Sequence, residues 1–130
     1  MQTVIACLLI ATFMPLICAW IGGYYRYTQL GVVDNKHPRI QASKLEGAGH
    51  RAYAAQQNCW EALAVFSAAL LALHMSGVVL ASVATVCVVF VLLRAVYIAC
   101  YLANQDLLRS TAFIGGFGIC IYLFYLALTF

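Results

Sequence analysis

Long apolar stretches separated by three polar breaks dominate the chain. Each stretch is close to the ~20 residues that a helix needs to cross a bilayer. The pattern therefore predicts membrane-spanning helices at about residues 3–25, 50–74, 78–103 and 107–129. We expect an all-α fold, an integral membrane four-helix bundle in which residues 1–130 form a single domain.

The three predicted connections differ in length. The second, Met75-Ser76-Gly77, is a very short turn, and the third contains Asn104-Gln105-Asp106. The first runs from Arg26 to Glu46 and carries most of the charged residues. A loop this long between two spans is uncommon, so we expect it to cover a site as well as to connect two helices.

The second predicted span begins with an unusually polar segment, Arg51 to Glu61. On a helix, Arg51, Asn58 and Glu61 fall within roughly 80° of one another and form one stripe. Such a stripe is expected to face a partner helix, water or a ligand rather than lipid. The alternative is a solvated helix start that snorkels towards the headgroups, which accounts for Arg51 but poorly for Glu61.

The third predicted span carries one polar face. Arg94, Tyr97 and Tyr101 recur at helical spacing within roughly 60°. Two tyrosines alone are typical of the aromatic belt at a membrane interface. An arginine on the same face favours a polar surface that binds an anion.

Composition agrees with a membrane protein, because 65% of the residues are hydrophobic and 8% are charged. Soluble domains carry about a quarter charged residues. The net charge is +3 and the basic residues are spread along the chain, so nucleic-acid binding is not indicated. The six cysteines show no Cys-x-x-Cys or Cys/His spacing and are interpreted as free, buried thiols.

The distribution of basic residues predicts the orientation. All of them lie on or next to the first and third connections, which should therefore be cytoplasmic, with both termini on the opposite side. This orientation brings the candidate polar residues to one face of the membrane: Arg51, Asn58, Glu61, Arg94, Tyr97, Tyr101 and Arg109.

These side chains suit a small polyanionic ligand that also carries an amine or amide. Arginines would bind its carboxylates and Glu61 would accept from an ammonium or amide group. Metal chemistry is not indicated, because one glutamate and scattered histidines provide no ligand cluster. No Ser/His/Asp or Cys/His arrangement falls on one helix face.

Three segments of the chain resemble one family, the membrane-associated proteins in eicosanoid and glutathione metabolism (MAPEG). They are Arg51 with Gln56 and Asn58-Cys59-Trp60-Glu61-Ala62-Leu63-Ala64-Val65-Phe66, then Arg94-Ala95-Val96-Tyr97 with Tyr101, and finally Leu108-Arg109-Ser110. Each segment is weak alone, but as a set in a four-span chain of this length they are fairly specific.

The resemblance implies a homotrimer that binds glutathione, as a co-substrate, between neighbouring subunits near the cytoplasmic face. It makes Gln56, Asn58 and Glu61 glutathione contacts. It makes Arg94, Tyr97 and Tyr101 the wall contributed by the third helix. Arg109 becomes the candidate catalytic residue that activates the thiol, and Arg51 a structural or peripheral contact.

The chain departs from the family pattern at three positions. Ala54 stands where many members have a second arginine, and Ala62 where the leukotriene-forming synthase has a tyrosine. Arg109 falls one residue later after Tyr101 than in that synthase. The departures bear on glutathione affinity and on the role of Arg109 rather than on the fold.

The resemblance implies a membrane-bound glutathione transferase or peroxidase acting on lipophilic electrophiles that enter from the bilayer. The alternative is a non-catalytic member that binds lipid or serves as a scaffold. A small multidrug transporter would also have four spans, but such exporters use a carboxylate in the first helix. Val4 to Gly23 contains no charged residue.

Overall fold

The computed structural model describes residues 1–130, which form helices joined by turns and loops, with no strand. Its long helices are α1 (Gln2–Leu30), α3 (Gly47–Met75), α4 (Ala84–Leu102) and α5 (Asp106–Thr129). The short helix α2 (Pro38–Ala42) lies between α1 and α3, and a 3-10 turn, η1 (Leu80–Val83), precedes α4. The predicted all-α, four-helix fold is confirmed.

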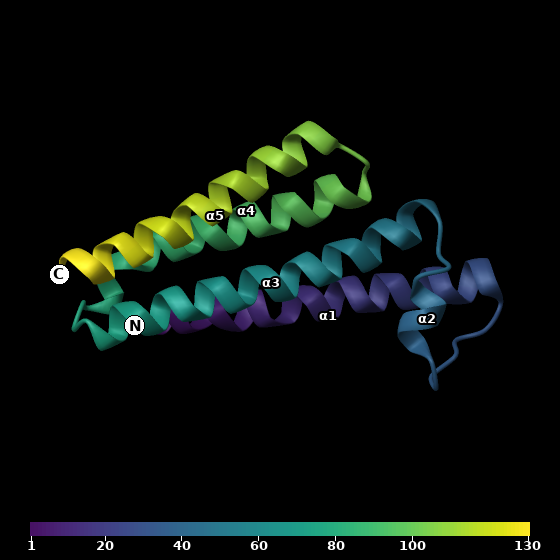
Figure 1. Cartoon of the computed structure of the whole chain (residues 1–130), viewed down its shortest axis with the longest axis horizontal. Coiled ribbons are helices and arrows are strands. Elements are labelled where there is room, and N and C mark those ends of the chain that lie inside the picture. The colour runs from purple at the N-terminus through teal and green to yellow at the C-terminus, as the bar shows by residue number, and fades with distance from the viewer.

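The four long helices form two antiparallel hairpins, α1 with α3 and α4 with α5 (Figure 1). Both termini and the connection before α4 lie at one end of the molecule. The α1–α3 connection with α2, and the α4–α5 turn, lie at the other end. The two hairpins diverge towards this second end, which we call the loop end.

Helix α1 continues to Leu30, past the predicted end of the span at residue 25. A helix of 29 residues is on the order of 43 Å long, more than the ~30 Å hydrocarbon core of a bilayer. Its polar end therefore projects beyond the apolar layer. Gly31 ends the helix with a φ of 75°, and its N–H donates to the Tyr27 carbonyl at 2.9 Å.

The first connection is ordered by one buried amide side chain. Gln41 of α2 donates from Nε2 to the Val32 carbonyl and accepts from the Asp34 N–H at 2.8 Å. The predicted polar connection thus contains a short helix that Gln41 ties to the chain just after α1.

The core lies in the half of the bundle away from the loop end. Phe66 of α3 stacks on Phe90 of α4, with ring centroids 4.0 Å apart and planes 11° apart. Cys7, Cys87 and Cys120 are buried in the same cluster as small apolar side chains. All six cysteines of the chain are free.

Glycines allow close helix contact at two places. A Cβ on Gly115 of α5 would lie 3.1 Å from Leu93 Cδ1 of α4. A Cβ on Gly49 of α3 would lie 2.9 Å from Tyr25 Cβ of α1, a distance at which something must shift. Small residues thus set how closely these helices approach, as they do in other membrane bundles.

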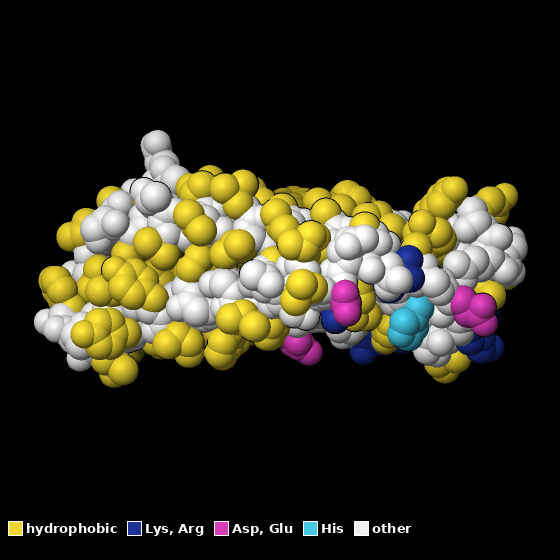
Figure 2. Space-filling view, turned by 90° about the horizontal axis from the view of Figure 1, so that it is seen from above, with side chains coloured by type: hydrophobic (Ala, Val, Ile, Leu, Met, Phe, Trp, Pro, Cys, Tyr) yellow, Lys and Arg dark blue, Asp and Glu magenta, His cyan; other side chains and the backbone are white.

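Apolar side chains cover much of the surface along the helices, whereas the charged side chains in view gather towards the loop end (Figure 2). Four segments are long and apolar enough to cross a membrane: Gln2–Leu30, Gly47–Met75, Leu80–Leu102 and Asp106–Thr129. The chain is therefore described as a multi-pass membrane protein.

Candidate functional site

Arg94 of α4 lies at the centre of the polar cluster and is only 3% exposed. Its Nη2 donates to Asn58 Oδ1 at 2.9 Å and to Cys59 Sγ at 3.5 Å, both on α3. Its guanidinium carbon also lies 4.2 Å from the centroid of the Tyr97 ring. A buried cation that makes no ion pair is thus held by an amide, a thiol and an aromatic face.

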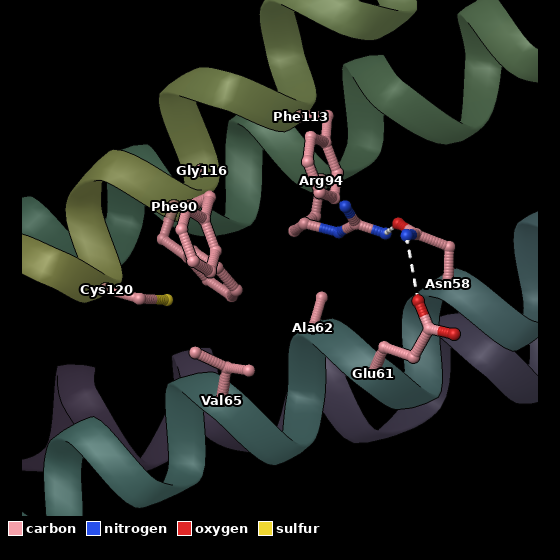
Figure 3. A pocket seen from close by; sticks show the side chains of 10 residues that line it. Asn58, Glu61, Ala62, Val65, Phe90, Arg94, Phe113, Gly116 and Cys120 are labelled. Carbon is pink, nitrogen blue, oxygen red and sulfur yellow. Dashed lines mark hydrogen bonds between the residues drawn. The ribbon is translucent and has the colours of Figure 1, made fainter.

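The hydrogen bonds continue from Asn58 to Glu61. Asn58 donates from Nδ2 to Glu61 Oε2 at 3.2 Å, so its amide joins the carboxylate to the guanidinium of Arg94 (Figure 3). The spacing of three residues on α3 places Asn58 and Glu61 side by side. The carboxylate itself is exposed and free to meet a ligand.

Tyr101 and Arg109 extend the cluster to α5. The guanidinium carbon of Arg109 lies 4.6 Å from the Tyr101 ring centroid, and the Tyr101 and Tyr97 rings meet edge to face at 5.6 Å. A polar groove of about 480 Å³ runs between these residues. Its lining is Asn58, Tyr97, Tyr101, Arg109, Ser110, Phe113 and Ile114.

A second cavity, of about 230 Å³, lies between α3, α4 and α5. Asn58, Glu61 and Arg94 gather at one end of it, and mainly apolar side chains line the rest (Figure 3). The apolar lining is Ala62, Val65, Phe90, Phe113, Gly116, Phe117 and Cys120. The cavity and the polar groove share Asn58 and Phe113.

The structure therefore brings together six of the eight residues selected from the sequence. They are Asn58, Glu61, Arg94, Tyr97, Tyr101 and Arg109. Their arrangement provides two cations, one carboxylate, one amide and two phenols beside an apolar cavity. Such a set can bind an anionic, amine-bearing molecule and place it against an apolar one.

Gln56 lies elsewhere in the monomer. It lines a separate pocket of about 290 Å³ between α1, α2 and α3, together with Arg26, Arg39, Tyr53 and Trp60. The cause is helical geometry, because Gln56 precedes Asn58 by two residues and so points about 200° away from it. In one subunit, Gln56 cannot share a ligand with Asn58.

Arg51 also lies outside both cavities. Its Nε donates to the Leu102 carbonyl at 3.2 Å, at the C-terminal end of α4. The last carbonyls of a helix lack intrahelical partners and attract a positive charge. Arg51 thus links the start of α3 to the end of α4.

Sequence reasoning overlooked three residues at the site, Cys59, Phe113 and Phe117. Cys59 contacts Arg94, although it was assigned only to the core. Phe113 lines both cavities and follows Arg109 at helical spacing, and Phe117 follows after four more residues. The sequence contains a signal for this arrangement. Residues 109, 113 and 117 are four positions apart, so their side chains lie on one face of a helix such as α5.

Comparison with known proteins decides the family. The sequence model of the MAPEG family matches residues 3–129. The chain belongs to the MAPEG family. Neither curated proteins nor solved structures give a significant match to it. MAPEG proteins are membrane helical bundles, and the family is associated in general with glutathione-dependent transferase and peroxidase chemistry.

Proposed function

We propose that this MAPEG protein is a membrane-bound glutathione-dependent transferase or peroxidase acting on lipophilic electrophiles. The observation that carries the proposal is a pair of neighbouring cavities that share the lining residues Asn58 and Phe113. One cavity is a polar groove with Arg109, and the other is a mostly apolar pocket with Arg94. An enzyme of this kind needs a positioned thiol beside a cleft for an apolar partner.

The charges of the cluster complement those of glutathione. Arg109 supplies a cation for a carboxylate or a thiolate, and the exposed Glu61 supplies an acceptor for the ammonium group. Asn58 and the Tyr97 and Tyr101 hydroxyls can bond to the peptide groups of the ligand. The polar cluster and glutathione thus match in charge and in hydrogen-bonding capacity.

Arg109 is assigned to the thiol. A free thiol has a pKa of ~8.5, and only a few per cent of it is ionised at neutral pH. Arg109 lies in the first turn of α5, where the positive end of the helix dipole adds to its own charge. A thiol held there with a pKa near ~6.5 would be mostly thiolate at neutral pH, which is the nucleophilic form.

In the proposed homotrimer, Gln56 and Asn58 can contribute to one glutathione site although they point away from each other in one subunit. The pocket with Gln56, Arg26 and Arg39 is polar and opens on the opposite side of α3. In a trimer, this pocket of one subunit can meet the groove of the next and complete a glutathione site between them. This assembly would restore cationic contacts where Ala54 provides none.

The orientation follows from the charged residues. The first and third connections lie at the loop end, and Tyr101 and Arg109 of the candidate site flank the α4–α5 turn at that end. We assign this end to the cytoplasm by the positive-inside rule, with both termini on the opposite side. Glutathione would then enter from the cytoplasm and the electrophile from the bilayer.

The test is a calorimetric titration with glutathione, followed by turnover with a lipophilic electrophile. The wild-type protein should bind glutathione, show the ultraviolet absorbance of a thiolate and form thioether. Arg109→Ala should lose the thiolate absorbance at neutral pH while still binding glutathione. Lys36→Ala, which removes a positive charge from the first connection, is the matched control.

One result would overturn the proposal, and a second would overturn the role given to Arg109. Lipid binding without any thiol-dependent product would identify a scaffolding or lipid-binding member of the family. Thiolate absorbance that persists in Arg109→Ala would transfer thiol activation to another group, with Arg94 as the next candidate.

A further inference from the structure

Cys59 is a buried nucleophile that the proposed reaction does not use. Its Sγ accepts a hydrogen bond from Arg94 Nη2 at 3.5 Å, and its side chain is 3% exposed. The one ion pair of the chain joins His37 and Asp34, so no carboxylate neutralises Arg94 directly. Of the two acceptors of Nη2, Asn58 cannot become an anion, whereas the Cys59 thiol can. A thiolate at Cys59 would therefore be the counter-ion that this buried guanidinium lacks.

A second buried thiol lies beside this one. Cys18 of α1 is fully buried and belongs to the same small core cluster as Cys59 of α3, together with Met14 and Ala55. The two thiols share a hydrogen bond, so their sulfur atoms lie within hydrogen-bonding reach. The helices that carry them run side by side in one hairpin (Figure 1). Two neighbouring sulfurs on separate helices are the arrangement from which a disulfide can form.

The other four cysteines lack part of this arrangement. Three of them are buried in the larger core cluster: Cys7, Cys87 and Cys120. The hydrogen bond from Arg94 reaches none of these three sulfurs, only that of Cys59. Cys100 is half-buried and belongs to neither cluster. The Cys18–Cys59 pair alone combines two neighbouring thiols with a cation that favours a thiolate.

Tight packing limits which molecules can reach Cys59. The gap beside it, bounded by Met14 of α1, Leu63 of α3 and Phe90 of α4, has no room for a water-sized molecule. An oxidant must therefore be small and uncharged, and it enters only when the helices separate briefly. A thiol as large as glutathione cannot follow it. Once Cys59 is oxidised, the neighbouring Cys18 thiol is the reductant within reach.

We propose that Cys18 and Cys59 form a reversible disulfide when a small hydroperoxide oxidises the protein, which makes the pair a redox modification site inside the bundle. The inference is independent of the proposed function, because it requires neither bound glutathione nor an electrophile. Disulfides that form in a reducing compartment are usually transient and respond to oxidants. The dithiol is accordingly the resting form, and the disulfide is the oxidised form.

The two thiols supply both electrons that the hydroperoxide takes up. The Cys59 thiolate attacks the terminal oxygen, the O–O bond breaks, and a sulfenic acid remains on Cys59. The departing alkoxide takes up the proton that the thiol lost. The Cys18 sulfur then attacks the sulfenic sulfur, the S–O bond breaks, and the hydroxyl leaves as water with the Cys18 proton. The sum is two thiols and one hydroperoxide giving one disulfide, one alcohol and one water, with a second water in place of the alcohol when the oxidant is hydrogen peroxide.

The disulfide would change the surroundings of Arg94. A disulfide sulfur carries no proton and cannot become a thiolate, so Asn58 is left as the acceptor that holds Nη2. The bond also joins α1 to α3 and closes the first connection into a covalent loop. Oxidation of the α1–α3 hairpin thereby reaches the residue at the centre of the polar cluster.

The test is thiol counting in the purified protein in detergent, after treatment with hydrogen peroxide. Maleimide labelling of the denatured protein should modify all six cysteines in the reduced form and two fewer in the oxidised form, with recovery after dithiothreitol. Trypsin, which cuts after Arg26, Arg51 and Arg94, should release residues 1–26 linked to residues 52–94. Undiminished labelling after oxidation, or lost thiols without this linked pair, would overturn the proposal.

Two alanine variants assign the bond, because each linked peptide contains a second cysteine, Cys7 or Cys87. Cys18→Ala should lose the linked pair. Cys7→Ala, which removes another buried cysteine of α1, is the matched control and should keep it. Fragmentation of the wild-type pair makes the same assignment without any variant. A pair that persists in Cys18→Ala, or a covalent dimer on a non-reducing gel, would refute a Cys18–Cys59 bond within one subunit.

The role of Arg94 is tested by the rate of disulfide formation. Arg94→Gln removes the positive charge and should slow the reaction at least about tenfold, since the thiolate and not the thiol is the nucleophile. Arg94→Lys keeps the charge and should react within about threefold of the wild type, because a nearby lysine also favours a thiolate. If both variants react as fast as the wild type or faster, access rather than charge controls the reaction, and the role given to Arg94 is refuted.

Discussion

Arg94 on α4 and Asn58 on α3 are joined by a hydrogen bond of 2.9 Å from Nη2 to Oδ1. This bond fixes the guanidinium at the end of the apolar cavity and connects it, through the Asn58 amide, to Glu61. The same contact therefore serves both stability and the site, since it bridges the α1–α3 and α4–α5 hairpins.

Loss of this bond should destabilise the bundle. Asn58→Leu keeps the size of the side chain but removes the acceptor from a buried cation, which costs about 1.5 to 3 kcal/mol for a bond to a charged group. Thermal unfolding in detergent should show a clear decrease in Tm. Gln57→Leu, the exposed neighbour, is the control and should unfold close to wild type. Equal Tm values for the two variants would mean that Arg94 finds another partner.

Arg51 should contribute to the stability of the fold and not to the affinity for glutathione. Arg51→Ala removes the donor to the Leu102 carbonyl, a part-buried bond whose loss is expected to cost about 1 kcal/mol. Hydrogen exchange should become faster at residues 102–106, while glutathione affinity stays within about threefold of wild type. A loss of affinity with unchanged exchange would return Arg51 to the binding site.

Periodicity predicted the fold and half of the site because both depend on local spacing. Arg94, Tyr97 and Tyr101 share a face of α4 whatever surrounds the helix, and each of them lines one of the two neighbouring cavities. Helical spacing also separates Gln56 from Asn58, but the family resemblance grouped them. The separation is a property of one subunit, and only an assembly can bring the two side chains to one ligand.

Other features depend on contacts that a single sequence does not specify. Nothing local indicates which carbonyl Arg51 will reach, because Leu102 lies on another helix. The apolar cavity results from small side chains on different helices, Ala62 and Gly116, that become neighbours only after packing. The extension of α1 to Leu30 was not predicted, because the polar residues after Tyr25 resemble a loop. The helix nevertheless continues through them, beyond the length that a bilayer requires.

Order in the first connection should depend on the ionised form of Asp34. The backbone N–H groups of His37 and Lys36 donate to its carboxylate at 3.1 and 2.8 Å and lower the pKa of Asp34 below its usual value. Because the folded pKa is depressed, this stabilisation is present above the ordinary aspartate pKa of ~3.9 and is lost as pH falls through the folded pKa.

The measurement is an NMR titration of the Lys36 and His37 amides between about pH 2 and 6, a range chosen to bracket the ordinary aspartate value. Both amide shifts should follow one transition with a midpoint below ~3.9. Asp34→Ala should abolish that transition. A midpoint at or above the ordinary value would mean that these hydrogen bonds do not favour the carboxylate.

Glu61 should contribute to glutathione binding more than to folding. Its carboxylate is exposed and accepts one bond from Asn58, so Glu61→Gln should change Tm little. If the ligand ammonium binds to this carboxylate, the loss of a bond between charged groups should weaken affinity about ten- to a hundredfold. Calorimetry of Glu61→Gln against Glu46→Gln, an acidic residue of the first connection, measures the effect.

A glutathione analogue that lacks the α-ammonium group makes this test specific to one contact. The analogue should bind the wild-type protein about as weakly as glutathione binds Glu61→Gln. Combining the variant with the analogue should cause little further loss, since both changes remove the same interaction. Additive losses would place the ammonium elsewhere and leave Glu61 as a partner of Asn58 alone.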